Sequence, residues 1–343
     1  MSYPVDIEDL TAEWLSEVLD DDVSSVRAEA IGTGQTAASY RLTLDAVDGP
    51  RTLVAKVAAG DDDARRRVAG GYRREVGLYA DLAATLDVRI PRCWHAVIGD
   101  DALRFTLLLE DLAPRTPGVQ ADGCSPARAG AAVENLAGLH ASRWADQSLF
   151  ALPYLDPPAA RASFMGDLTL RCADVFLERY GDHLAATEVD TLHRCAAAVE
   201  RWYPGAPETF ALLHGDYRVD NLLFGAAEDD VVAIDWQTLA VGPPGRDLAY
   251  FLSMSLPVET RRSAEDELVA IYHAALLARG VGSYTLEECR RDYRQGALQA
   301  PVITMIGAAL STAERSSAAD TMFLSMTARA CTAVRDLGTL DLV

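Results

Sequence analysis

The hydrophobic pattern of the chain changes character near residue 112. Before it, apolar and polar residues alternate as in strands at 23–31, 39–46, 52–58, 93–98 and 103–109, and one helical stretch covers 62–86. After it, a Pro/Gly-rich link at 113–125 leads into a mainly helical region. A length of 343 residues suits two domains. The order therefore predicts an α+β, bilobal fold, with a small β-rich N-terminal lobe (1–112) holding one main helix and a larger, mainly helical C-terminal lobe (113–343).

Helical periodicity divides the second lobe into separate segments. Helices are predicted at 126–143, 158–179, 186–202, 246–255, 259–279, 285–310 and 318–337. Ser125 and Pro126 form a start signal for the first of them, because serine caps helices and proline suits the first helical position. The stretch 212–235 interrupts this pattern and has the look of two short strands joined by a loop.

Charge and composition exclude several classes of protein. The formal net charge is −20, and such a surface repels a phosphate backbone, which argues against nucleic-acid binding. No apolar run is long enough for a membrane span, and residues 1–10 lack a secretory signal, so we expect a cytoplasmic protein. Six scattered cysteines predict reduced thiols rather than disulfides, and the dispersed histidines argue against a zinc site.

A single lysine stands among the 31 basic residues, since all the others are arginine. Arginine replaces lysine wherever either cation serves, so Lys56 indicates a place that needs a compact ammonium group. Lys56 lies on the third predicted strand. Glu75 is the only glutamate of the helical stretch that follows it, and is therefore its natural partner.

The strongest chemical signal is Leu-Leu-His-Gly-Asp-Tyr-Arg-Val-Asp-Asn at 212–221. It places Asp216 five positions before Asn221, and a second carboxylate, Asp235, follows the apolar run 231–234. If the flanking strands pair as a hairpin, these three side chains converge. Two carboxylates and an amide oxygen are hard ligands that suit Mg²⁺ bound together with substrate phosphates.

Phosphoryl transfer needs the parts that these residues supply. A carboxylate accepts the proton of the attacking hydroxyl, and cations hold the nucleotide phosphates. Lys56 provides one cation, and Gly32 and Gly34 after the first strand let backbone amides approach phosphates. We expect His214 to brace the loop at 212–221. Arg218 is expected either to pair with Asp220 or to contact a phosphate.

These motifs resemble the aminoglycoside phosphotransferase and choline kinase-like group of the protein-kinase-like fold. The resemblance covers roughly residues 20–255. Its motifs are His-Gly-Asp at 214–216 with Asn221, Ile-Asp-Trp at 234–236, the hinge-like Leu-Leu-Leu-Glu-Asp-Leu at 107–112, and Gly-Arg-Asp-Leu-Ala-Tyr at 245–250. In this group the aspartate at position 247 braces the catalytic loop, and we also expect it to cap its helix.

The resemblance implies a role for each matched residue. Asp216 would be the catalytic base, Asn221 and Asp235 the Mg²⁺ ligands, and Lys56 the ATP-binding cation oriented by Glu75. The remaining nucleotide contacts would come from Gly32, Gly34 and Thr36 over the phosphates, and from Glu110 to Leu112 near adenine. Protein-kinase control by loop phosphorylation is not expected, because no activation segment stands between 236 and 247.

The predicted activity is ATP- and Mg²⁺-dependent transfer of the γ-phosphoryl group to a hydroxyl of a small molecule. An antibiotic-like acceptor such as an aminoglycoside is the best-known case in the group, and would make the chain a resistance enzyme. A sugar, an amino alcohol, a hydroxyacyl thioester, and a non-catalytic ATP-binding pseudokinase remain as alternatives. The sequence leaves the oligomeric state and the choice between ATP and GTP open.

Overall fold

The computed structural model describes residues 6–32, 36–206, 208–310 and 317–343, which form two units. Unit 1 takes in the chain up to Thr85 together with Ile90–Pro114 and Ile234–Leu239. Unit 2 takes in Leu86–Arg89, Arg115–Ala233 and Ala240–Val343. The excursion Ile234–Leu239 carries the Ile-Asp-Trp motif into unit 1, which a single boundary near residue 112 does not anticipate.

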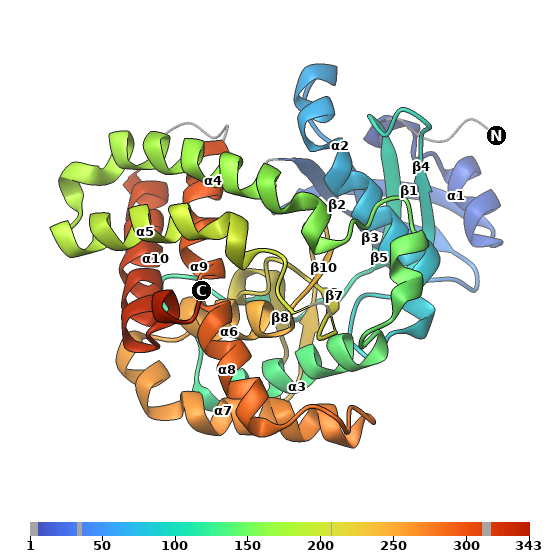
Figure 1. Ribbon diagram of the computed structural model, residues 1–343. Helices are drawn as coiled ribbons and strands as arrows, with labels where there is room; N and C mark the ends of the chain where they lie inside the picture. The colour runs from blue at the N-terminus through green and yellow to red at the C-terminus, as the bar shows by residue number, and fades with distance from the viewer. Residues whose placement is uncertain (1–5, 33–35, 207, 311–316) are drawn as a thin grey trace. The chain divides into compact units, whose positions relative to one another are not determined.

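Unit 1 is built on a five-stranded antiparallel sheet in the order β1-β2-β3-β5-β4 (Figure 1). Its elements are α1 (Ala12–Leu19), β1 (Val23–Ile31), β2 (Ala37–Ala46), β3 (Thr52–Ala58), α2 (Asp62–Gly77), β4 (Cys93–Ile98) and β5 (Phe105–Glu110). The helix α2 packs against β4 and β5. The predicted order of three strands, one helix and two strands is therefore confirmed. Leu42, Leu53 and Leu108 lie in the buried core between the sheet and α1.

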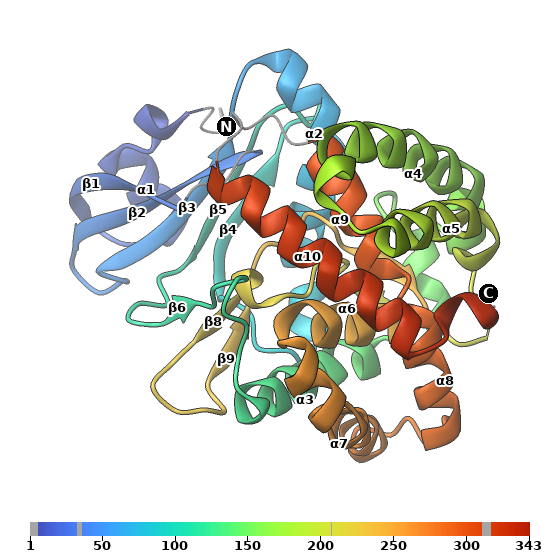
Figure 2. The same ribbon diagram turned by 90° about the vertical axis from the view of Figure 1, so that its left-hand side faces the viewer.

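Unit 2 is mainly helical, and Figure 2 presents α10 lying across α9 and α6, both of which it contacts. Its helices are α3 (Pro126–Ser142), α4 (Pro158–Tyr180), α5 (Ala186–Trp202), α6 (Gly245–Ser255), α7 (Val258–Ala278), α8 (Leu286–Gly296), α9 (Gln299–Leu310) and α10 (Ser317–Asp336). Its short strands are β6 (Thr116–Pro117), β7 (Ala211–Leu213), β8 (Leu222–Phe224), β9 (Val231–Ala233) and β10 (Ala240–Gly242). Ser125 caps α3 as expected, because its Oγ accepts a hydrogen bond from the backbone amide of Arg128.

One predicted helix is wrong. The periodic stretch 285–310 forms two helices, α8 and α9, rather than one. The first ends at Gly296, whose Cα packs so closely on the backbone of Gly245 that a side chain there would clash. Apolar periodicity runs through this junction, so the pattern alone did not reveal the break.

Two further observations concern the whole described chain. Within the described residues, no helix is long and apolar enough to cross a membrane. All six cysteines are free thiols, four of them buried and two half-buried, as their scattered positions predicted.

Candidate active site

The ammonium of Lys56 lies between two carboxylates within unit 1. Its Nζ donates hydrogen bonds to Glu75 Oε1 at 2.7 Å and to Asp235 Oδ1 at 3.1 Å. Strand β3, the middle strand of the sheet, carries Lys56, and the last turn of α2 carries Glu75. The expected pair of Lys56 and Glu75 is therefore present, and the structure adds Asp235 to it.

The electrostatics of this cluster follow from burial. Burial of Lys56 opposes its charged form, but the carboxylates of Glu75 and Asp235 outweigh that effect and raise its pKa. Burial, helped by the charge of Asp235, raises the pKa of Glu75, although Lys56 acts in the opposite direction. The side chain of Glu75 is only 1% exposed, whereas that of Asp235 is 46% exposed. Asp235 thus keeps an accessible carboxylate edge beside a fixed cation.

The segment Ile234–Leu239 is fastened to unit 1 at several points. Asp235 has a φ of +64°, a left-handed conformation that is uncommon for a residue with a side chain and is enriched at functional sites. The amide of Trp236 donates to Glu75 Oε1 at 3.4 Å. Thr36 Oγ1 donates to Gln237 Oε1 at 2.6 Å. Thr36, which we expected over the phosphates, is therefore bound to the residue that follows the Ile-Asp-Trp motif.

The glycine-rich turn after β1 is described only at its ends. Gly32 has a φ of +72°, a conformation that favours glycine over any residue with a side chain. Gly34 lies outside the described residues. A phosphate-covering role for this turn stays a prediction.

The predicted hinge follows directly from β5. Glu110 is exposed and pairs with Leu53 of β3, and its amide donates to the carbonyl of Arg92 at 2.8 Å. Asp111 forms an ion pair with Arg41 at 2.8 Å, and Leu112 is buried. The contact of Glu110 and Leu112 with adenine stays a prediction.

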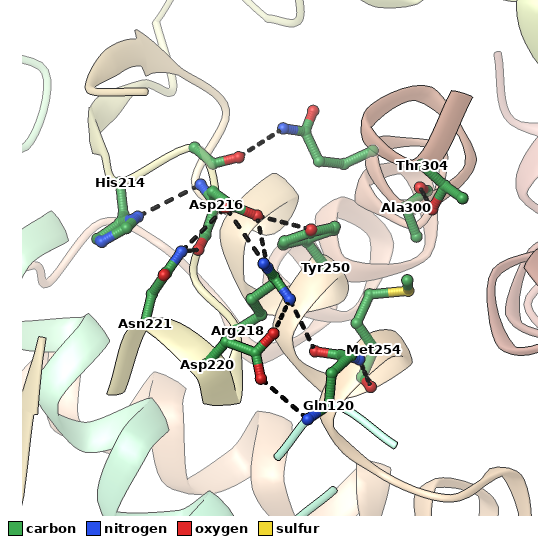
Figure 3. A network of polar contacts seen from close by, with 12 residues as sticks. Gln120, His214, Asp216, Arg218, Asp220, Asn221, Tyr250, Met254, Ala300 and Thr304 are labelled. Atoms are coloured by element: carbon green, nitrogen blue, oxygen red, sulfur yellow. Dashed lines mark hydrogen bonds and ion pairs between the residues drawn. The ribbon is translucent and has the colours of Figure 1, made fainter. Parts of the chain in front are cut away.

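Within unit 2, Asp216 and Asn221 are brought together by the loop between β7 and β8. Asn221 Nδ2 donates to both Asp216 Oδ2 and the carbonyl of Asp216, each at 2.9 Å (Figure 3). Gly215 supports the turn with a φ of +83°. The flanking strands differ from the expected single hairpin, because β7 pairs with β10 whereas β8 pairs with β9. The convergence of Asp216 and Asn221 with Asp235, which belongs to unit 1, stays a prediction.

Asp247 holds this loop by its backbone. Its fully buried carboxylate accepts from the amides of His214 at 2.6 Å and Gly215 at 3.0 Å. His140 Nε2 lies 3.5 Å from the same carboxylate, and its Nδ1 lies 2.6 Å from the hydroxyl of Tyr272. The brace is therefore confirmed, but the helix cap is wrong, because α6 begins at Gly245 and Asp247 lies inside its first turn.

His214 and Arg218 complete the loop. His214 is buried, and its Nδ1 accepts from the amide of Asp216 at 3.3 Å, which agrees with the structural role that we expected. Arg218 donates through Nη1 to Asp220, and its Nε lies 3.3 Å from Asp216 Oδ1. Pairing with Asp220 is thus confirmed, and contact with a phosphate stays a prediction.

Two further residues, Tyr250 and Gln120, contact this loop and were not predicted from the sequence. Tyr250 donates its hydroxyl proton to Asp216 Oδ1 at 2.7 Å. Gln120 Oε1 lies 3.5 Å from a guanidinium nitrogen of Arg218, and the backbone amide of Gln120 donates to the carboxylate of Asp220 at 2.9 Å. Tyr250 stood in the quoted motif at 245–250 three positions after Asp247, which is one helical turn and a usable signal. Gln120 lies in the Pro/Gly-rich link at 113–125, where no sequence pattern marked it.

Comparison with solved structures defines the class of fold. Choline kinase from Cryptosporidium parvum superposes with a TM-score of 0.59 at 10% identity, covering 92% of this chain and 89% of that one. Aminoglycoside 2'-phosphotransferase-IIIa in its GDP complex superposes with a TM-score of 0.55 at 15% identity, covering 92% and 95%. Plasmodium vivax ethanolamine kinase gives 0.54 at 12% identity, covering 97% and 89%. The chain thus shares the fold of these small-molecule kinases and phosphotransferases.

Family membership follows from the sequence match. The Ecdysteroid kinase-like family model matches residues 35–279, and the chain belongs to this family.

Two curated relatives match locally. Acyl-CoA dehydrogenase family member 11 of Gallus gallus is 35% identical over 74 residues, and member 10 of Mus musculus is 42% identical over 53 residues. These stretches are 21% and 14% of this chain and only 10% and 5% of those proteins, so the chain spans a small part of their length.

Proposed function

We propose that this chain is a small-molecule kinase that transfers the γ-phosphoryl group of ATP to a hydroxyl group. The observation that carries the proposal is the carboxylate of Asp216, which Asn221 and Tyr250 hold by one oxygen each. Its side chain is 23% exposed, so part of the carboxylate faces outward. Family and fold support a kinase, and the GDP complex of a structural neighbour supports the use of a nucleotide.

Asn221 and Asp235 have the chemistry of Mg²⁺ ligands. Both amide hydrogens of Asn221 point toward Asp216, which leaves the amide oxygen on the other side of the group. Asp235 offers a partly exposed carboxylate. These hard oxygens fit Mg²⁺, which when bound would neutralise charge on the phosphate oxygens.

The chain's own residues account for the remaining chemistry. Asp216 orients the acceptor hydroxyl and takes its proton as that oxygen bonds to the γ-phosphorus. The bond from the γ-phosphorus to the bridging oxygen breaks, and ADP leaves. Lys56, fixed by Glu75, binds nucleotide phosphates as a point charge. Positioning and electrostatics supply most of the acceleration in such transfers.

Two classes of acceptor stand out. The first is an antibiotic-like acceptor or an amino alcohol. We expected the antibiotic-like acceptor from the sequence, and the folds shared with choline kinase and with an aminoglycoside phosphotransferase support both equally. A hydroxyacyl thioester is the second candidate, favoured by the local similarity to two proteins that are named for acyl-CoA chemistry.

A phosphoryl-transfer screen tests the proposal. The protein is incubated with Mg²⁺ and either ATP or GTP, and with kanamycin, choline, ethanolamine, glucose or 3-hydroxybutyryl-coenzyme A. Product mass identifies the acceptor by the added phosphoryl group, and Asp216→Ala is the matched blank. Nucleotide binding without transfer to any acceptor would favour a non-catalytic ATP-binding protein instead.

A further inference from the structure

Helix α6 contacts the loop of Asp216 directly at two levels, and at a third level through Gln120. Asp247 accepts from the backbone of the loop, and Tyr250 donates to the carboxylate of Asp216. One turn further, the carbonyl of Met254 accepts from Gln120 Nε2 at 2.5 Å, and Gln120 reaches Arg218 (Figure 3). Positions 247, 250 and 254 share one helix face, because three- and four-residue steps return to the same side.

The hydroxyl of Tyr250 is a buried donor that faces the carboxylate of Asp216. The residue is fully buried, and its ring packs with Met254 and Ala300 in a core cluster. Burial and the neighbouring charge of Asp216 raise the pKa of Tyr250 well above its usual value. The hydroxyl therefore keeps its proton and remains a hydrogen-bond donor.

Asp216 is held at both oxygens by groups of different origin. Oδ1 accepts from Tyr250 at 2.7 Å, and Oδ2 accepts from Asn221 at 2.9 Å. Arg218 Nε lies within 3.5 Å of both oxygens, and its own position is set by Asp220 and Gln120. Rotation of the carboxylate would break the bonds to Tyr250 and Asn221 together.

We propose that Tyr250 is a positioning residue for phosphoryl transfer, whose hydroxyl fixes the carboxylate plane of Asp216 toward the acceptor. This inference rests on the proposed function. Tyr250 gives up no proton in the reaction, because the acceptor proton goes to Asp216. Its contribution lies in orientation, and loss of orientation in such a site costs up to about 100-fold in rate.

A pair of tyrosine variants tests this role. Tyr250→Phe removes the hydroxyl and keeps the ring. Tyr293→Phe is the matched control, because Tyr293 is also buried and its hydroxyl also donates to a carboxylate at 2.7 Å, that of Glu265 on α7. With the acceptor found in the screen, Tyr250→Phe should lower kcat about 10- to 100-fold with an unchanged nucleotide KM, while Tyr293→Phe keeps kcat. Both should lower Tm to a similar extent.

Two results would overturn the proposal. One is a kcat of Tyr250→Phe within twofold of the wild type, and the other is an equal loss of kcat in both variants. If the wild type transfers phosphate to no acceptor, the proposed function fails, and crystal structures decide the role of Tyr250 separately. In Tyr250→Phe the Asp216 carboxylate should rotate or occupy two orientations over an unchanged backbone at 211–221; an unmoved carboxylate would contradict the inference.

Discussion

Replacing Lys56 with methionine leaves two carboxylates facing each other without their shared cation. The side chain of Glu75 is 1% exposed, so its unpaired charge would stay buried. The side chain of Asp235 is 46% exposed, so water screens its charge. Removing one partner of a buried ion pair costs about 3–5 kcal/mol, because the remaining charge stays buried. We therefore expect Lys56→Met to lower the free energy of unfolding by about that amount, a large share of the roughly 5–15 kcal/mol typical of proteins.

A double variant separates the effect of the unpaired Glu75 charge on stability from the effect of the packing lost with the lysine side chain. Lys56→Met/Glu75→Gln replaces the buried carboxylate with a neutral group of the same shape, so most of the lost stability should return. Nucleotide binding should stay lost in both variants, since neither carries the ammonium. Urea unfolding followed by tryptophan fluorescence measures the first effect, and calorimetric titration with ATP measures the second.

The control for this experiment is an exposed ion pair in the same unit. Arg66 and Asp63 lie 2.6 Å apart with side chains 60% and 80% exposed, so Arg66→Met should cost no more than about 1 kcal/mol. The reasoning is refuted if Lys56→Met unfolds within 1 kcal/mol of the wild type, a margin set by that same control. Equal stability of the single and double variants would also refute it.

Other variants probe the loop and the sheet. Asp216→Ala should lower kcat about 10²- to 10⁴-fold with ATP affinity unchanged, and an intact kcat would remove it from the role of base. Asp247→Asn places an amide against two backbone donors, so we expect a loss of about 1–3 kcal/mol by urea unfolding together with lower kcat, and unaltered stability would count against the brace. Burial lowers the pKa of His95, so its share of stability is full above its unfolded value of about 6.5 and is lost as pH falls below it. When the pH is lowered from about 7.5 to about 5.5, on either side of the unfolded value, the free energy of unfolding should therefore fall less for His95→Gln than for the wild type. An equal fall in both proteins would show that His95 does not contribute to the pH dependence of stability.

Local pattern was enough for most elements and failed where packing decides. The strands at 23–31, 52–58 and 93–98 have the predicted bounds, because alternation and turn residues mark them directly. The break between α8 and α9 depends on the approach of Gly296 to Gly245, residues 51 positions apart. No periodicity within 285–310 records such a distant contact.

The residues of the candidate site also fall into those that the sequence could predict and those that depend on the fold. Lys56 and Glu75 were predictable as partners, because one lysine and one helical glutamate left a single pairing. Asp216 and Asn221 were predictable from their spacing along one loop. The third member of the lysine cluster, Asp235, comes from a segment 179 residues away, and only the fold brings it to that cation.

Helix α6 indicates how residues that hold a catalytic loop, such as Asp247 and Tyr250, can be found in a sequence. Every residue of Gly245–Ser255 is buried, so exposure to solvent does not distinguish one face of this helix from another. Asp247 and Tyr250 nevertheless lie on one stripe, and buried polar groups require hydrogen-bond partners. A polar stripe on a fully buried helix must therefore face other polar groups, and here the candidate is the loop around Asp216. Polar residues spaced three or four apart within a fully buried helix thus predict which face of the helix meets the site.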